Sequence, residues 1–220
     1  MPVKYVFAMF RYCEISYSRI LTNLKSGNNM NTESKTFSVR TIVYPALFTA
    51  ALCVLSPFSI NIGPIPISLA TSIIYLAACC LGAKHGTISV IIYILLGAVG
   101  MPVFTNYGAG LQKIVGPTGG FIIGYIPLVY ITGLFADYAK SGKIKKVLSE
   151  NISVILGMIL GTLLLYTCGL IWFIYLTESS LSTSLALCVY PFIPGDIAKM
   201  VFTMVIFSHI RTRNLVYNMT

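Results

Sequence analysis

Two charged residues stand three positions apart near the end of the chain, inside a hydrophobic run. The stretch PFIPGDIAKM covers residues 191–200 and carries Asp196 and Lys199. An ionisable side chain at membrane depth costs at least ~2.5 kcal/mol and usually marks a pathway or a binding pocket. Such a pair offers a carboxylate that accepts N–H bonds and an ammonium group that attracts an anion. This chemistry suits a small, partly apolar acid.

The helix that would position this pair is predicted to begin beside Pro194 and Gly195. Proline fits a first helical turn, which would place Asp196 in that turn and Lys199 one turn deeper, on the same face. In a purely structural reading, Asp196 complements the helix dipole and Lys199 pairs with it or extends toward the interface. A dipole term of about 0.3–1 kcal/mol does not offset a lysine deeper in the span. We therefore favour a binding site.

The composition is that of an integral membrane protein. Of the 220 residues, 56% are hydrophobic and only 10% are charged, whereas soluble domains carry about 25% charged residues. The apolar runs are continuous, without the alternation of a membrane barrel. Their lengths predict an all-α protein with six transmembrane helices in the cell membrane. The expected spans are 41–58, 66–82, 86–101, 119–138, 151–176 and 191–210.

Positive charges concentrate on one side of this six-span arrangement. Thirteen of the 15 Lys and Arg residues precede the first span, follow the sixth, or lie between spans two and three or four and five. The positive-inside rule makes that side cytoplasmic and places both termini there. Because topology accounts for the net charge of +9, a nucleic-acid-binding role loses its main support.

Three regions are expected along the chain. A cytoplasmic N-terminal extension covers residues 1–40, the six-helix substrate-binding domain covers 41–210, and a cytoplasmic tail covers 211–220. The extension could be an amphipathic helix, an unstructured tail, or a stretch before a true start at Met30. The outer loop between the third and fourth helices, 101–118, is long, glycine-rich and nearly uncharged. We expect it to cap the outer face of the bundle, although an ordinary connector is the alternative.

The sequence offers no constellation for an enzyme, a metal or a cofactor. The six cysteines lie mostly inside spans without C-x-x-C spacing, and His85 and His209 are isolated, so a metal site is not predicted. No G-x-x-x-x-G-K-[ST] motif occurs, so ATP hydrolysis would require another subunit. A lipid-modifying enzyme would need a nucleophile, a base or a metal cluster that the outer face lacks.

Five motifs follow one another along the chain: GPIPIS (63–68), LGAKHG (81–86), LLGAVGMPVF (95–104), GPTGGF (116–121) and PFIPGDIAK (191–199). Together they resemble the BioY family, the biotin-capturing S components of energy-coupling-factor transporters. The resemblance implies a six-helix protein that binds biotin outside the cell as a transported ligand. It also implies partners, namely a transmembrane coupling protein and two ATPases. An autonomous carrier driven by an ion gradient, with Asp196 as the coupling group, is the alternative.

The resemblance assigns roles to individual residues. It implies that Asp196 and Lys199 contact biotin, whose carboxylate suits the lysine and whose ureido N–H groups suit the aspartate. Asn106, in the outer loop, is expected to contact the ureido ring. Tyr107 could stack on the ligand or anchor the loop at the membrane interface. Relatives often carry Gln at the position of Ala70, so this chain lacks a polar side chain that those relatives have near the pocket.

A small-residue pattern on the first helix concerns the partners. Ala46 and Ala50 match the AxxxA face with which the family docks on its coupling protein. Packing within the monomer is the alternative, because small residues at this spacing are common between membrane helices.

Overall fold

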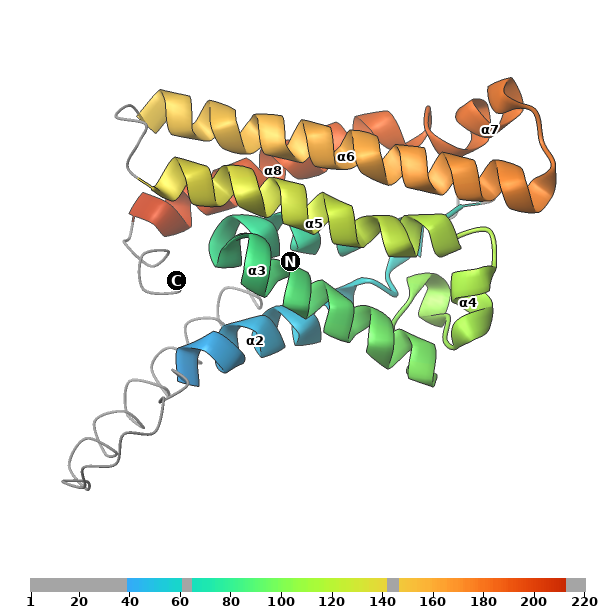
Figure 1. The fold of residues 1–220 in the computed structure, drawn as a ribbon, viewed down its shortest axis with the longest axis horizontal. Helices are drawn as coiled ribbons and strands as arrows, with labels where there is room; N and C mark the ends of the chain where they lie inside the picture. Colours follow the sequence, from blue (N-terminus) through green and yellow to red (C-terminus); the bar gives the residue numbers. More distant parts are fainter. Residues whose placement is uncertain (1–38, 61–64, 142–146, 213–220) are drawn as a thin grey trace. The chain divides into compact units, whose positions relative to one another are not determined.

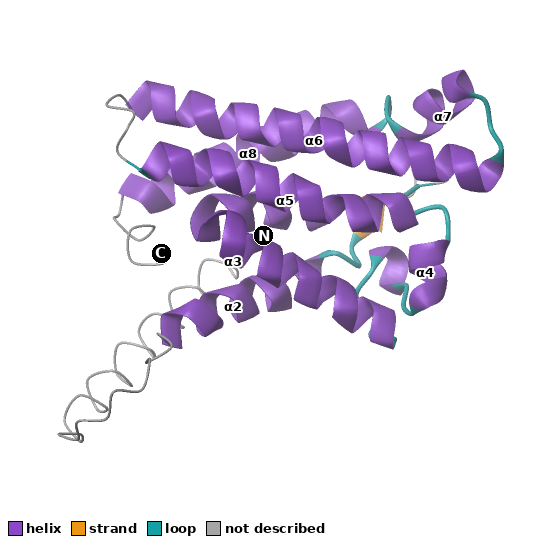
Figure 2. Cartoon of the chain, viewed as in Figure 1, coloured by secondary structure: helices purple, strands orange, loops and turns teal. Residues whose placement is uncertain are grey.

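The computed structural model describes residues 39–60, 65–141 and 147–212, and these residues form a bundle of helices (Figures 1 and 2). Most of the expected extension 1–40 and tail 211–220 therefore lies outside the described residues. Strands β1 (Ser59–Ile60) and β2 (Ile67–Ser68) pair antiparallel. The helices are α2 (Val39–Leu55), α3 (Ala70–Val99), the 3₁₀ turn η1 (Thr105–Tyr107), α4 (Leu111–Val115), α5 (Gly119–Lys140), α6 (Val147–Thr177), α7 (Leu181–Cys188) and α8 (Phe192–Thr212).

Four of the described helices are long and apolar enough to cross a membrane, which confirms an all-helical membrane protein. They are Ala70–Val99, Gly119–Lys140, Glu150–Thr177 and Phe192–His209, and the shorter apolar helix Thr41–Leu55 accompanies them. The predicted spans 119–138, 151–176 and 191–210 each match one helix, and the first, 41–58, corresponds to α2. The predicted second and third spans, 66–82 and 86–101, instead fall within the single element α3.

A sharp break divides α3 into a first arm, 70–81, and a second arm, 83–99. Gly82 has φ 76° and ψ −174°, a conformation that glycine adopts readily because it has no Cβ. A Cβ added at Gly86 would lie 3.4 Å from Ala78 Cα, although eight residues of straight helix span about 12 Å. The chain therefore turns back at Gly82, the last residue of the predicted second span.

Helix α5 shows the direction of the two arms. It packs against α3 on one side and α6 on the other, while α2 and α8 also pack on α3 (Figure 1). Phe121, near the start of α5, lines the same cavity as Thr71 of the first arm and Tyr93 of the second. Asp137, near the end of α5, bonds to Ala83 at the break. The first arm thus runs away from the cavity along α5, and the second arm returns toward it.

Candidate functional site

The charged pair of the sequence lies near the start of α8 and points into the bundle. Lys199 Nζ and Asp196 Oδ1 are 3.0 Å apart, and Asp196 is only 3% exposed. The helix begins at Phe192, earlier than Pro194 suggests, so Asp196 lies beyond the first turn. A dipole interaction at the helix terminus therefore explains its position less well than its side-chain partners do.

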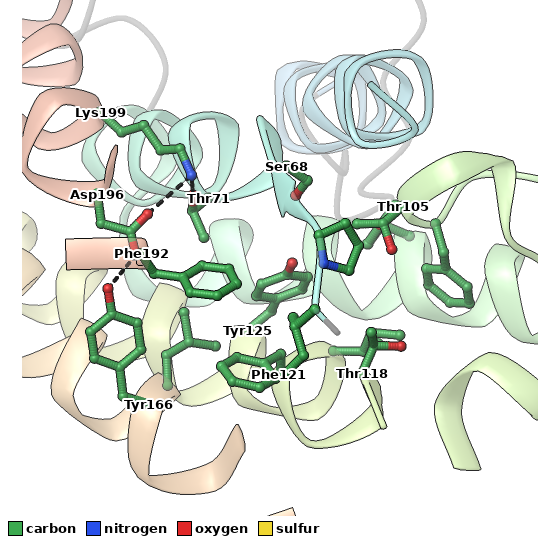
Figure 3. A pocket seen from close by; sticks show the side chains of 16 residues that line it. Ser68, Thr71, Thr105, Thr118, Phe121, Tyr125, Tyr166, Phe192, Asp196 and Lys199 are labelled. Carbon is green, nitrogen blue, oxygen red and sulfur yellow. Dashed lines mark hydrogen bonds and ion pairs between the residues drawn. The ribbon is translucent and has the colours of Figure 1, made fainter. Parts of the chain in front are cut away.

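Two neutral hydroxyls from other helices complete the pair. The Tyr166 hydroxyl of α6 donates to Asp196 Oδ2 at 2.6 Å, and Lys199 Nζ donates to Thr71 Oγ1 of α3 at 3.0 Å. Figure 3 shows these groups converging from three helices. A buried ion pair is tolerated when additional hydrogen bonds satisfy its remaining atoms. The three-helix arrangement therefore holds both charges in a fixed geometry.

The pair forms one end of a cavity whose other walls are largely apolar and aromatic. The rings of Phe121 and Phe192 are stacked, with centroids 6.2 Å apart and planes 14° apart. A molecule with a polar head and a compact apolar body would satisfy such a site. The lining residues are Ile65, Pro66, Ser68, Thr71, Tyr93, Phe104, Thr105, Thr118, Phe121, Ile122, Tyr125, Leu165, Tyr166, Phe192, Asp196 and Lys199.

Tyr93 connects one cavity wall to the helices and the loop around it. Its hydroxyl lies 2.6 Å from Ser56 Oγ and donates to the Val103 carbonyl oxygen at 3.3 Å. Its ring meets Phe104 edge to face, with centroids 5.6 Å apart. The segment that follows α3 is thus attached to the wall of the site.

The loop containing Asn106 also docks on the loop that follows α2. The Asn106 N–H donates to the Pro57 carbonyl oxygen at 3.1 Å, and Ser59 Oγ donates to Asn106 Oδ1 at 2.8 Å. Phe58 and Tyr107 meet edge to face, with centroids 6.2 Å apart. Asn106 and Tyr107 have φ values of 57° and 55°, which are uncommon for residues other than glycine. These contacts hold the two loops together.

The predicted ligand contacts divide into two groups. Asp196 and Lys199 line the cavity, whereas Asn106 and Tyr107 are not among the lining residues, and Tyr107 is 62% exposed. Direct contact of these two residues with a ligand stays a prediction. Ala70 is fully buried, and its neighbours Ser68 and Thr71 bring hydroxyls to the cavity.

Several lining residues were not expected from the sequence. Tyr166 and Thr71, which bond directly to the charged pair, lie in long apolar helices where a single hydroxyl does not stand out. Phe121 and Phe192 belong to the quoted motifs GPTGGF and PFIPGDIAK, so their neighbourhood could have indicated them. Thr105 immediately precedes the expected Asn106.

The alanine pair of α2 lies on the surface of the described bundle. Ala46 and Ala50 are both exposed, as are Ile42 and Val54 at 59% and 64%. Residues four apart share a helix face. The four side chains therefore form one apolar ridge with small residues at its centre.

Known proteins resemble the chain over most of its length. The model of the BioY family matches residues 29–215. The biotin transporter BioY of Thermotoga maritima is 42% identical over 103 residues, which cover 47% of this chain and 61% of that protein. The probable biotin transporter BioY of Pyrococcus horikoshii is 35% identical over 73% of this chain and 90% of that protein. The crystal structure of the S-component for biotin from an ECF-type ABC transporter superposes with a TM-score of 0.69 and 32% identity, covering 82% and 95% of the two chains.

Proposed function

The chain belongs to the BioY family, and we propose that it is the membrane subunit that captures biotin for an energy-coupling-factor transporter. It is a transport protein with several membrane-crossing helices and not an enzyme. The relatives are biotin transporters, and the similar crystal structure is a biotin S-component. Partner subunits would supply the ATP-driven step.

The buried pair of Asp196 and Lys199 is the observation that carries this proposal. Biotin has ureido N–H groups that need an acceptor, which Asp196 supplies, and its ureido carbonyl or its valerate carboxylate can accept from Lys199. Its thiophane ring and the methylene groups of its valerate chain are apolar, and the stacked Phe121 and Phe192 offer matching surface. Asn106 and Tyr107 would join the site if their loop moved when the ligand bound.

The proposed topology has six crossings, with the two arms of α3 as the second and third. The break at Gly82 supports this count because both arms run alongside α5 in opposite directions. It also brings the turn that carries Lys84 to the same end of the bundle as Lys140, in keeping with a cytoplasmic side rich in cations. Both termini would then be cytoplasmic, and loop 101–118 would lie outside.

The exposed ridge of α2 is the proposed contact with the transmembrane coupling protein. Ala46 and Ala50 would let a partner helix approach closely, and the flanking Ile42 and Val54 would extend the apolar contact along the ridge. Two ATPases would complete the assembly.

Biotin binding by the purified full-length chain in detergent tests the function. We expect Asp196→Asn and Lys199→Ala to abolish high-affinity binding, with folding checked by circular dichroism and gel filtration. Glu178→Gln and Lys84→Ala serve as matched controls because both residues are exposed. Wild-type affinity in either site variant would contradict the proposed site.

A second experiment tests the transport mechanism. We expect uptake of biotin into vesicles to require the coupling protein and the ATPases. Uptake by this chain alone, abolished by collapse of an ion gradient, would instead favour an autonomous carrier. Biotin released on denaturing protein purified from biotin-grown cells would identify the ligand directly.

A further inference from the structure

The end of α5 that lies away from the cavity carries two charged residues that bond to the break in α3. Asp137 Oδ2 accepts the backbone N–H of Ala83 at 2.9 Å. Lys140 Nζ donates to the backbone carbonyl oxygen of Cys80 at 2.9 Å. One carboxylate and one ammonium group from the same helix therefore bond to the main chain on either side of Gly82.

These two bonds satisfy groups that a broken helix leaves open. The end of the first arm leaves carbonyl oxygens without helical partners, and the start of the second arm leaves N–H groups without them. An anion suits a helix N-terminus and a cation suits a C-terminus. Asp137 and Lys140 have the signs required at the respective ends. The residues that they bond, Ala83 and Cys80, are 5% and 1% exposed, so little water is available to replace them.

Two glycines allow this arrangement to form. A Cβ at Gly82 would collide with the Asp137 carboxylate, and a Cβ at Gly133 would collide with the backbone of Gly82 and Ala83. Gly133 lies one turn before Asp137 on the same face of α5. The break therefore rests directly on α5, with no side chain between the two backbones.

The angle of the break affects the cavity because residues of both arms of α3 line that cavity. Thr71 and Tyr93 line the cavity, and each lies eleven residues from Gly82, about 16 Å along a helix. A change of about 10° in the angle between the arms would move either residue by about 3 Å. Such a shift is enough to break the 3.0 Å hydrogen bond from Lys199 to Thr71.

We propose that Asp137 and Lys140 are positioning residues for ligand binding: by bonding to both sides of the Gly82 break, they fix the angle between the arms of α3. This inference rests on the proposed biotin site, but neither residue touches that site. The charges act on the ligand through Thr71 and Tyr93.

The test combines biotin affinity with local exposure in the full-length protein. Cys79 and Cys80 lie at the end of the first arm and are 0% and 1% exposed, so their alkylation by N-ethylmaleimide, located by peptide mass spectrometry, reports opening of the break. We expect Asp137→Ala and Lys140→Met each to weaken biotin binding about 10-fold or more, from the loss of a partner for a buried polar group. Both should speed alkylation of Cys80, and saturating biotin should slow it again, because linkage between two sites is reciprocal.

Conservative and matched variants separate positioning from general destabilisation. Asp137→Asn keeps an oxygen acceptor for Ala83 and should lose less affinity than Asp137→Ala, even if the alanine variant folds poorly. Lys84 is an exposed cation beside the break, so Lys84→Met should change neither biotin affinity nor Cys80 alkylation. Wild-type affinity for biotin in both Asp137→Ala and Lys140→Met would overturn the inference, as would equal affinity loss in Asp137→Asn and Asp137→Ala. Failure of the wild-type protein to bind biotin would instead overturn the proposed function. Unchanged Cys80 alkylation in the Asp137 and Lys140 variants would then by itself overturn their proposed hold on the break.

Discussion

Removal of the charges of Asp196 and Lys199, first singly and then together, separates folding from ligand binding. Asp196→Asn leaves the largely buried ammonium group with Thr71, and Lys199→Met leaves the buried carboxylate with Tyr166. Breaking a buried ion pair by removing one partner typically costs about 3–5 kcal/mol, whereas replacing both is often neutral or stabilising. We therefore expect each single variant to lose roughly 3–5 kcal/mol of unfolding free energy and the double variant to recover most of it.

Unfolding in detergent, followed by circular dichroism, would measure this double-mutant cycle, and isothermal titration calorimetry would measure biotin affinity. The coupling free energy should reach several kcal/mol, because the two side chains are in direct contact. Affinity should behave differently. The double variant offers the ligand neither charge, so it should bind biotin at least about 100-fold more weakly, a loss of roughly 3 kcal/mol.

The two readouts can refute the reasoning separately. If destabilisation in the double variant equals the sum of the single losses, Asp196 and Lys199 do not compensate each other's charge. If the double variant binds biotin as the wild type does, the pair is structural and does not contact the ligand. Glu178→Gln combined with Lys84→Met removes two exposed charges and should change neither quantity.

Three further predictions follow from the contacts around the site and the ridge. Tyr166→Phe removes a 2.6 Å bond to the Asp196 carboxylate and should weaken biotin binding roughly 10- to 150-fold, from about 1.5–3 kcal/mol for a charged hydrogen bond; unchanged calorimetric affinity would contradict this. Ala46→Trp should abolish copurification with the coupling protein yet preserve biotin binding, whereas Leu163→Trp, at another exposed position, should leave copurification intact. Trp172 is the single tryptophan and donates to the Gly116 carbonyl oxygen in loop 101–118. If this loop moves when biotin binds, the emission of Trp172 should shift, and an unchanged spectrum under saturating biotin would count against such movement.

The sequence predicts the charged pair because ionisable residues are rare within membrane-spanning runs and are therefore easy to recognise. Two ionisable residues in an apolar run must share a helix face when they are three positions apart. The structure confirms that Asp196 and Lys199 point into the bundle together. The hydroxyls that complete the pair were not predicted, since Thr71 and Tyr166 belong to helices far apart in sequence and only the tertiary packing brings them together.

The break in α3 shows a second limit of prediction from composition. Hydropathy ends the second predicted span at residue 82, and the chain turns at that residue because Gly82 permits the backbone conformation of the break. The stabilising partners of that turn, Asp137 and Lys140, lie more than fifty residues later. Asn106 shows what the sequence leaves open: its bonds to Pro57 and Ser59 hold it against a neighbouring loop, Thr105 before it lines the cavity, and its contact with a ligand stays a prediction.

The bonds already present in the site determine how it can discriminate between ligands. Asp196 and Lys199 have protein partners before any ligand arrives, so a ureido or carboxylate group must compete with them, and the exchange of bonds yields less net free energy than two unpaired charges would. Burial of apolar rings against Phe121 and Phe192 must then contribute most of the affinity. A ligand that fills the apolar space without offering hydrogen bonds would leave the bonds of the pair in place and gain only from apolar burial. A ligand that broke these bonds without replacing them would strand buried polar groups, which sites of this kind reject strongly. The charged pair therefore determines which polar groups a tightly bound ligand must carry, and the aromatic walls supply much of the remaining affinity.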